Sequence, residues 1–321
     1  MSPRAHCPVA VVFITAPRRA GPSPAGVATL IGIARETTRY DVRMRRSIVT
    51  ASIVSALMAS AAGHELWVTA HTWRAEPGAS VTILTHVGGR FPNPDSFTTP
   101  DRIESVRLIG PASDDVQKPA LRREGDSLAA DVRLPATPGT YVAIVTVKPR
   151  AVEKPADVFA AHLEHQGLDH VREDRARRGE SDKPARERYS RYGKTLLRVG
   201  IGGGEAATKP AGLKIELVPL DDPTALRPGD RLRLRLLYDG QPIAGTLVGA
   251  IYASADSKPD EWPFTARTDG SGDVAFTLEN PGPWLIRAVH MVRREGETGP
   301  QAADWETYWA SLTFALQGHH H

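Results

Sequence analysis

Residues 231–238 read Arg-Leu-Arg-Leu-Arg-Leu-Leu-Tyr, the most regular pattern in this chain. Successive side chains of a β-strand point to opposite faces, so Leu232, Leu234 and Leu236 share one face with Tyr238. The arginines then occupy the other face, where we expect solvent contact. The turn dipeptide Asp239-Gly240 follows directly, which is typical of a hairpin connection. The pattern predicts a half-buried strand, and therefore a sheet that packs on one side.

The surrounding sequence, residues 212–317, repeats this arrangement. Apolar runs at 240–248, 274–278 and 284–292 are separated by turn-rich segments at 268–272 and 281–283. Residues 64–150 show similar short alternating runs, bounded by turn clusters such as Glu76-Pro77-Gly78 and Thr137-Pro138-Gly139. Strands at such spacing are typical of a sandwich. We predict an N-terminal β domain over 64–150 and a C-terminal β-sandwich domain over 212–317.

Between these domains the periodicity becomes helical. One predicted helix begins at Pro155 and stops at Gly167, and a second runs from about 168 to 178. A third is predicted from Pro184, because Tyr189, Tyr192, Leu196 and Leu197 recur at helical spacing. Residues 151–200 are thus expected to be a helical insert, and 201–211 a linker. The predicted fold is mainly β: two immunoglobulin-like or prealbumin-like β-sandwich domains with a helical insert between them.

The sequence changes character at residue 63. Met44-Arg45-Arg46 precedes an apolar stretch that ends in Ser60-Ala61-Ala62-Gly63, which is the three-part layout of a secretory signal peptide. We therefore predict a leader over 44–63 and export to the periplasm. Residues 1–43 are then either a start-site over-call or a disordered extension. Apart from the leader, no segment approaches the ~20 apolar residues of a membrane span.

Removing the leader changes the charge and the available chemistry. Residues 1–63 carry eight Arg, one Glu and one Asp, a net charge of +6, and the whole chain carries +3, so the exported part carries −3. The pI of 9.0 therefore gives no support for nucleic-acid binding. Cys7, the only cysteine, is also removed, so any metal site in the mature chain must use nitrogen and oxygen ligands.

Several motifs, in order along the mature chain, resemble the DUF4198 family. They are His64-Glu-Leu-Trp67, Gly179-Glu-Ser-Asp182, Arg186-Glu-Arg-Tyr-Ser-Arg-Tyr192, Leu226-Arg-Pro-Gly-Asp230, Gly282-Pro-Trp284, Ala288-Val-His-Met-Val292 and the segment from Asp304 to Phe314. Members of this family are often named as periplasmic components of nickel or cobalt uptake. The resemblance implies an exported two-domain β protein associated with transition metals, with a membrane metal transporter as its partner. In similar proteins the histidine follows an Ala-x-Ala site directly, whereas Gly63 intervenes here.

His64 is the first candidate metal ligand, because cleavage places it at or near the new chain end. Cleavage before His64 gives an α-amine and an imidazole on one residue. Cleavage before Ala62 gives Ala-Gly-His, which offers four nitrogens in the tetragonal arrangement that suits Cu(II) or Ni(II). Cleavage before Gly63 gives an intermediate set. Alternatively, His64 only begins the first strand and binds no metal.

His290 is the second candidate, an imidazole on an otherwise apolar strand face. If residues 284–292 form a hairpin with the strand after Asp304, then His290, Asp304 and Glu306 lie at the same end of the sheet. Histidine with carboxylates is a suitable ligand set for a divalent ion. Alternatively, His290 is a hydrogen-bonded core residue, and one carboxylate only orients it.

The remaining histidines are weaker candidates. His86 precedes Gly88-Gly89, a turn that permits close backbone approach to a ligand, so we include it as a possible metal ligand. His162, His165 and His170 are expected on a solvated, charged helical face. The tail from 318 to 321, which ends in three histidines, carries little weight.

Enzyme signatures are missing from the sequence: it has no Gly-x-Ser-x-Gly, no His-Glu-x-x-His and no phosphate-binding loop. We therefore expect no enzyme. The sequence favours a periplasmic protein that binds Ni, Co or Cu through His64, His290 and Asp304 or Glu306. One alternative is a metal-free binding module for carbohydrate or peptide. A less favoured alternative is a copper redox enzyme with an N-terminal histidine chelate.

Overall fold

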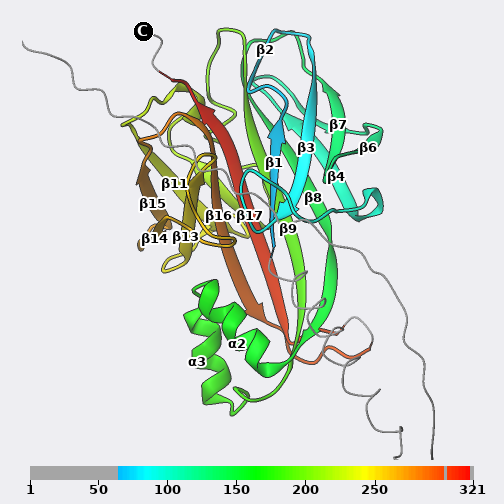
Figure 1. Cartoon of the computed structure of the whole chain (residues 1–321), viewed down its shortest axis with the longest axis vertical. Helices are drawn as coiled ribbons and strands as arrows, with labels where there is room; N and C mark the ends of the chain where they lie inside the picture. Colours follow the sequence, from blue (N-terminus) through cyan, green and yellow to red (C-terminus); the bar gives the residue numbers. More distant parts are fainter. Residues whose placement is uncertain (1–63, 300–301, 319–321) are drawn as a thin grey trace, which may run out of the picture. The chain divides into compact units, whose positions relative to one another are not determined.

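The computed structural model describes residues 64–299 and 302–318 (Figure 1). The predictions for residues 1–63, including the leader, lie outside the described residues, as do the histidines at 319–321. The described residues contain two α-helices, α2 (Ala156–His165) and α3 (Asp169–Arg177). Two short 3-10 helices are η1 (Pro100–Arg102) and η2 (Pro223–Ala225).

The described strands form three sheets, called here the first, the central and the third sheet. The first sheet contains four strands in the order β1 (Glu65–Ala70), β3 (Ser80–Gly88), β7 (Ser127–Arg133) and β6 (Leu121–Glu124). The third sheet is built around β11 (Arg231–Tyr238), which pairs with β10 (Ile215–Pro219), β12 (Gln241–Pro242) and β15 (Asp273–Thr277). Both sheets are antiparallel in all their pairings.

The central sheet is larger and contains strands from both predicted β domains. Its order is β14 (Phe264–Arg267), β13 (Leu247–Tyr252), β16 (Gly282–Arg293), β17 (Trp305–Leu316), β9 (Ala185–Val199), β8 (Gly139–Lys154), β4 (Ile103–Ile109) and β5 (Asp114–Gln117), with β2 (Arg74–Ala75) also pairing β9. The pairing of β17 with β9 is parallel, which joins the two halves of the sheet.

The two faces of the central sheet bury different cores. On β8, Val142 and Ile144 point toward the third sheet and pack against leucines of β11. The alternate residues Tyr141 and Ala143 pack against the first sheet. Because side chains alternate along a strand, one strand can supply both cores. The first and third sheets therefore cover opposite faces of the shared central sheet.

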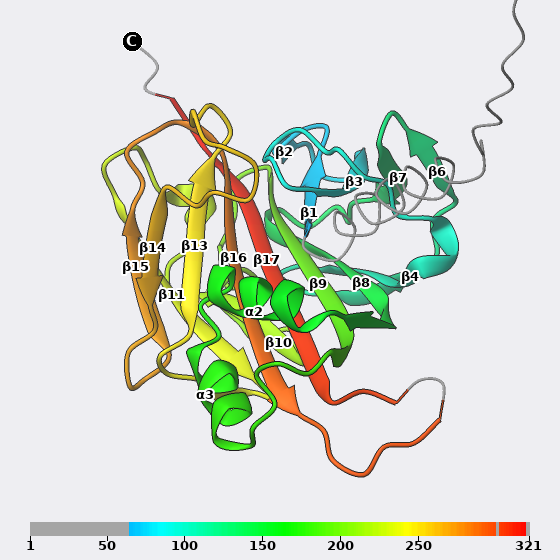
Figure 2. The ribbon, with the colours of Figure 1, turned by 60° about the horizontal axis from the view of Figure 1, so that its bottom comes forward.

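Helices α2 and α3 cover the same face as the first sheet, next to β16 and β17 (Figure 2). Phe159 of α2 and Val171 of α3 belong to one buried cluster with Val289 and Trp309, which are odd-numbered residues of those strands. None of the helices described in residues 64–299 and 302–318 has the length and apolar composition needed to cross a membrane.

The predicted fold class is confirmed: the described chain is mainly β, with sheets packed face to face and two helices inserted between strands. The prediction of a third helix from Pro184 is wrong, since residues 185–199 form β9. This strand lies between β8 and β17 and is buried on both faces. Such a strand loses the alternation of apolar and polar residues, so its apolar positions resembled helical spacing.

Candidate functional site

His64 lies immediately before β1, and its side chain is 15% exposed. Its Nδ1 lies 3.3 Å from Oδ1 of Asp95, which belongs to the loop after β3. Its carbonyl oxygen accepts a hydrogen bond of 2.7 Å from Nη2 of Arg191 on β9. Glu65, the next residue, is paired with Gly88. His64 is thus held where the glycine turn after β3 begins.

Two glycines in that turn bring carboxylates close to the backbone. A Cβ atom at Gly88 would lie 2.9 Å from the backbone nitrogen of Asp95, so only glycine fits without a shift. A Cβ atom at Gly89 would lie 2.9 Å from Oδ1 of Asp260. Gly89 also donates to Oδ2 of Asp95 at 3.3 Å and accepts from the backbone N–H of Asp260 at 2.5 Å. The turn therefore holds both carboxylates against its own backbone.

Asp260 has an unusual backbone, with φ of +59°. Left-handed backbone is uncommon outside glycine, although Asp tolerates it better than most residues. Burial raises the pKa of its carboxyl group and Asp95 raises it further, whereas His64 and His165 lower it. These opposing effects place Asp260 within electrostatic reach of Asp95, His64 and His165. A strained polar residue held beside other ionisable groups is a typical feature of functional sites.

Buried charged groups lie next to His64 on the same face of the central sheet. Glu65 is buried, with Oε1 at 3.5 Å from Nε of Arg287, and Arg287 also donates to Gln166 at the end of α2. Burial raises the pKa of Glu65 to about 7, although Arg287 and Arg191 lower it. Burying such groups is costly unless they are paired. The pairs fix the position of β1 relative to α2 and β16.

His86 is a hydrogen-bonded core residue in this structure. Its Nε2 lies 2.7 Å from Oγ1 of Thr69, and its Nδ1 lies 2.6 Å from Oγ of Ser127. Its ring stacks on Trp67 at 5.5 Å between centroids. Burial lowers its pKa to about 4. Both ring nitrogens are engaged, so the arrangement gives the sequence-based choice of His86 as a ligand no support.

The predicted hairpin of β16 and β17 is present, with His290 opposite Tyr308. The two predicted carboxylates are nevertheless paired with arginines. Asp304 lies 2.7 Å from Arg186, and Glu306 lies 3.3 Å from Arg188. Both arginines belong to the segment predicted to be helical, where β9 runs parallel to β17. Both carboxylates therefore have an arginine as counter-charge, and their positions require no metal ion.

His290 instead faces the third sheet, where its ring lies 4.8 Å from that of Tyr238 and 5.8 Å from that of His170. Burial, together with His170, lowers its pKa to about 4. His64 contacts Arg191, an odd-numbered residue on the opposite face. His64 and His290 therefore do not share a site. In the described part of the chain, no three His, Cys, Asp or Glu side chains are placed to hold a metal ion together.

The helical histidines differ from one another. His162 was expected to be solvated, but its side chain is 7% exposed and lies 3.8 Å from Glu187. This expectation is wrong because α2 packs that face onto the central sheet. His165 and His170 are exposed, as expected. Asp95 and Asp260 were missed, although the Gly88-Gly89 pair did indicate a close approach at this turn.

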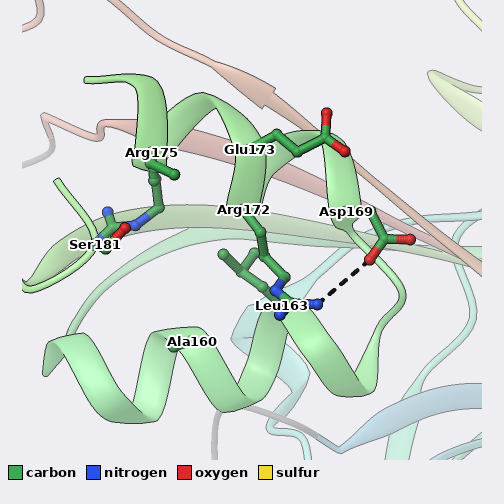
Figure 3. Close-up of a pocket in the computed structure, with 8 residues that line it drawn as sticks. Ala160, Leu163, Asp169, Arg172, Glu173, Arg175 and Ser181 are labelled. Carbon is green, nitrogen blue, oxygen red and sulfur yellow. Dashed lines mark ion pairs between the residues drawn. The ribbon is translucent and has the colours of Figure 1, made fainter. Parts of the chain in front are cut away.

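The groove between α2 and α3 has a volume of about 550 Å³ (Figure 3). Asp169 and Arg172 at its edge form an ion pair of 3.6 Å. Arg175 is buried against Phe159 and donates to the carbonyl oxygens of Glu180 and Lys183. These contacts close the helical insert onto the start of β9, and none of the sequence-predicted ligands lines the groove.

The sequence over residues 61–292 matches a family described as "Domain of unknown function (DUF4198)". The chain belongs to the DUF4198 family. A search of curated proteins finds no match for this DUF4198 chain. The family description assigns no activity, so any function must be argued from the site.

Solved structures similar to this DUF4198 protein are remote. The D0-D1 domain of intimin is 13% identical, with 78% of this chain and 97% of that one covered and a TM-score of 0.20. The adhesin InvE of Yersinia pseudotuberculosis is 12% identical, covering 78% and 58%, with a TM-score of 0.21. Salmonella alpha-2-macroglobulin is 11% identical, with 79% of this chain and 15% of that one covered and a TM-score of 0.22. Likenesses this remote carry no argument about function.

Proposed function

We propose that this protein is exported to the periplasm and binds a divalent transition-metal ion, Ni, Co or Cu, at its mature N-terminus. It would act in the uptake or handling of that ion, with a membrane metal transporter as partner. The observation that carries the proposal is the position of His64 beside Asp95 and Asp260. The Gly88-Gly89 turn holds both carboxylates at the chain end that cleavage would create.

The donor types suit the proposed cargo. Imidazole nitrogen binds Ni, Co and Cu well, and carboxylate oxygen completes mixed sets for divalent ions. Because no three described side chains form a site by themselves, the chain end must supply a further donor. An α-amine has a pKa near 8 and loses its proton to a metal at modest cost. Cleavage of the leader therefore creates a ligand as well as releasing the protein.

Arg191 and Glu65 act as positioning residues in this proposal. The hydrogen bond from Arg191 to the carbonyl oxygen of His64 fixes the main chain of the ligand residue. Glu65 is anchored by Arg287 on the far side of the same short segment. Residues that orient a ligand in this way reduce the entropy lost on binding.

The test is calorimetry of the mature protein with Ni(II), Co(II) and Cu(II), with His319, His320 and His321 replaced by serine so that the tail binds nothing. The proposal predicts that His64→Ala and Asp95→Asn each weaken binding by roughly tenfold or more. Asp304→Asn is the matched control, since that carboxylate is engaged by Arg186. Binding that is weaker than ~10 μM in the parent protein, or that survives His64→Ala unchanged, contradicts the proposal.

A further inference from the structure

We propose that His170 and His290 form a second site for a divalent transition-metal ion, separate from His64, in the cavity beside the open edge of β16. The cavity has a volume of about 390 Å³ and is lined by the α2–α3 connection, residues 244–246, Arg267 and His290. His290 faces the third sheet, whereas His64 contacts Arg191 on the opposite face of the central sheet. The second site therefore stands or falls independently of the function proposed above.

The site exists because β16 continues beyond its neighbour. Pairing with β13 ends at Val248, which lies opposite Ala288, so no strand among the described residues pairs with 289–293 on that side. The start of α3 lies there instead. Nε2 of His170 donates to the carbonyl oxygen of Met291 at 2.9 Å, which satisfies a backbone acceptor that no strand reaches. This bond brings the imidazole of His170 to the side of His290.

The two rings have a separation that suits a shared ion. Their centroids are 5.8 Å apart and their planes differ by 20°. Since a metal–nitrogen bond is about 2.0–2.1 Å long, two imidazoles that bind one ion have ring centres roughly 5 to 6 Å apart. The observed spacing falls within this range. Because the rings are stacked and each lone pair lies in its ring plane, both side chains must turn for the two nitrogens to meet at one ion.

Each ring also has a nitrogen available. Because a carbonyl oxygen can only accept, Nε2 of His170 carries the proton, and Nδ1 of the neutral ring has a lone pair. A backbone carbonyl that fixes the tautomer in this way is typical of metal-binding histidines. Within residues 64–299 and 302–318, neither nitrogen of His290 has a hydrogen-bond partner, and its ring contacts the rings of Tyr238 and His170. In its neutral form this ring therefore has one nitrogen lone pair that no protein group uses and that an ion can take.

Arg267 links two walls of the cavity by its hydrogen bonds. Its Nη1 donates to the carbonyl oxygen of Gly245 at 2.8 Å, and its Nη2 lies 2.6 Å from Oδ2 of Asp169. The guanidinium group therefore joins the wall at Gly245 to the wall at Asp169. Because Asp169 directly precedes His170, this contact also fixes the position of His170. Two imidazoles leave the other coordination positions of the ion to water or to a small ligand that arrives with it.

The experiment measures the number of Cu(II) ions bound by calorimetry, in full-length mature protein with His319, His320 and His321 replaced by serine. Cu(II) is the probe because it binds imidazole most tightly among the divalent ions considered. The variants are His290→Gln and the exposed His170→Gln, each alone and in a His64→Ala background. His71→Gln is the control, because that exposed histidine pairs with Glu124 away from the cavity.

The inference predicts that His64→Ala protein still binds one ion, and that adding His290→Gln or His170→Gln weakens this remaining binding by roughly tenfold or more. The control leaves it unchanged. Binding of an ion in the His64→Ala background that is insensitive to both substitutions overturns the inference, as does the absence of any bound ion there. If His64→Ala alone changes nothing while His290→Gln removes one ion, the second site stands and the function proposed for His64 fails.

Discussion

Nη2 of Arg191 donates a 2.7 Å hydrogen bond to the carbonyl oxygen of His64, linking the middle of the central sheet to the residue before β1. The guanidinium group is itself buried and packs over the rings of Tyr189 and Trp309. Its position is therefore fixed by the core. Through this bond the fold determines where the proposed N-terminal ligand lies.

We expect Arg191→Lys to weaken metal binding at the chain end by roughly tenfold, the usual effect of losing a group that orients a ligand. Lysine keeps the charge but lacks the planar fork that reaches the carbonyl oxygen while stacking on the rings. Calorimetry with Ni(II) measures the effect. Arg186→Lys, at the exposed ion pair with Asp304, is the control and should leave the affinity unchanged. Equal affinities in both variants would show that Arg191 has no positioning role.

Gly88→Ala should disturb the candidate site and lower the free energy of unfolding by about 1–3 kcal/mol, the usual cost of overpacking. The new Cβ atom would lie 2.9 Å from the backbone nitrogen of Asp95 and force that loop away from His64. Urea denaturation and metal titration measure the two effects. Gly270→Ala is the matched control, because a Cβ atom there meets nothing within 4 Å. Unchanged metal binding in Gly88→Ala would remove Asp95 from the site.

Lys194 and Glu216 form a buried ion pair of 3.1 Å between the central and third sheets, and Glu216 also accepts from the backbone N–H groups of Ala211 and Gly212. Lys194→Met should lower the free energy of unfolding by about 3–5 kcal/mol, because it leaves a buried carboxylate without its counter-charge. The double variant with Glu216→Leu should be less damaging than the single one. Lys214→Met, at an exposed pair with Asp239, should cost less than about 1 kcal/mol. Urea denaturation measures the free energy of unfolding of each variant. Equal losses in Lys194→Met and Lys214→Met would contradict the prediction.

Acidification should destabilise the protein partly through His86, whose pKa burial lowers from 6.5 to about 4. Above pH 6.5 the ring is neutral in both states, and its contribution to stability is complete. As the pH falls from 6.5 to about 4, the unfolded chain binds a proton that the folded chain does not. The free energy of unfolding then falls by up to ~1.4 kcal/mol per pH unit for this group.

Replacing His86 with glutamine should therefore flatten the pH dependence of the free energy of unfolding over that interval. The exposed Gln241 provides the control, since Gln241→Asn changes no ionisable group and should leave the slope as it is. Denaturant titrations at several pH values between 4 and 7 measure the slope. An unaltered slope in His86→Gln would mean that the ring is protonated with equal ease in both states.

The regular strands of this fold could be predicted because their patterns are local. Residues 231–238 form β11 as predicted, and the expected hairpin from Trp284 onward is β16 with β17. The strand β9 could not be recognised, because a strand buried on both faces has no alternation to show. Because residues 185–199 were assigned to a helix, the ion pairs of Arg186 with Asp304 and of Arg188 with Glu306 could not be predicted.

The candidate site was only half predictable for a related reason. His64 follows from the position of the leader, which is a local feature. Asp95 and Asp260 reach it through loops far apart in the sequence, and only the paired glycines at 88 and 89 indicated that something approaches there. His290 was recognised, but its partner His170 was not, because their contact depends on where β13 ends.

The most direct test of the account compares Ni(II) binding by the mature protein with binding by the same chain when residues 44–63 are retained. Mass spectrometry first identifies the mature N-terminal residue. The account predicts an N-terminus at Ala62, Gly63 or His64. With His290→Gln in both forms to remove the second site, it predicts binding tighter than ~10 μM only after cleavage, because cleavage supplies the amine ligand. Equal affinity in the two forms, or a mature chain that begins elsewhere, would contradict the proposal that the N-terminus holds the ion.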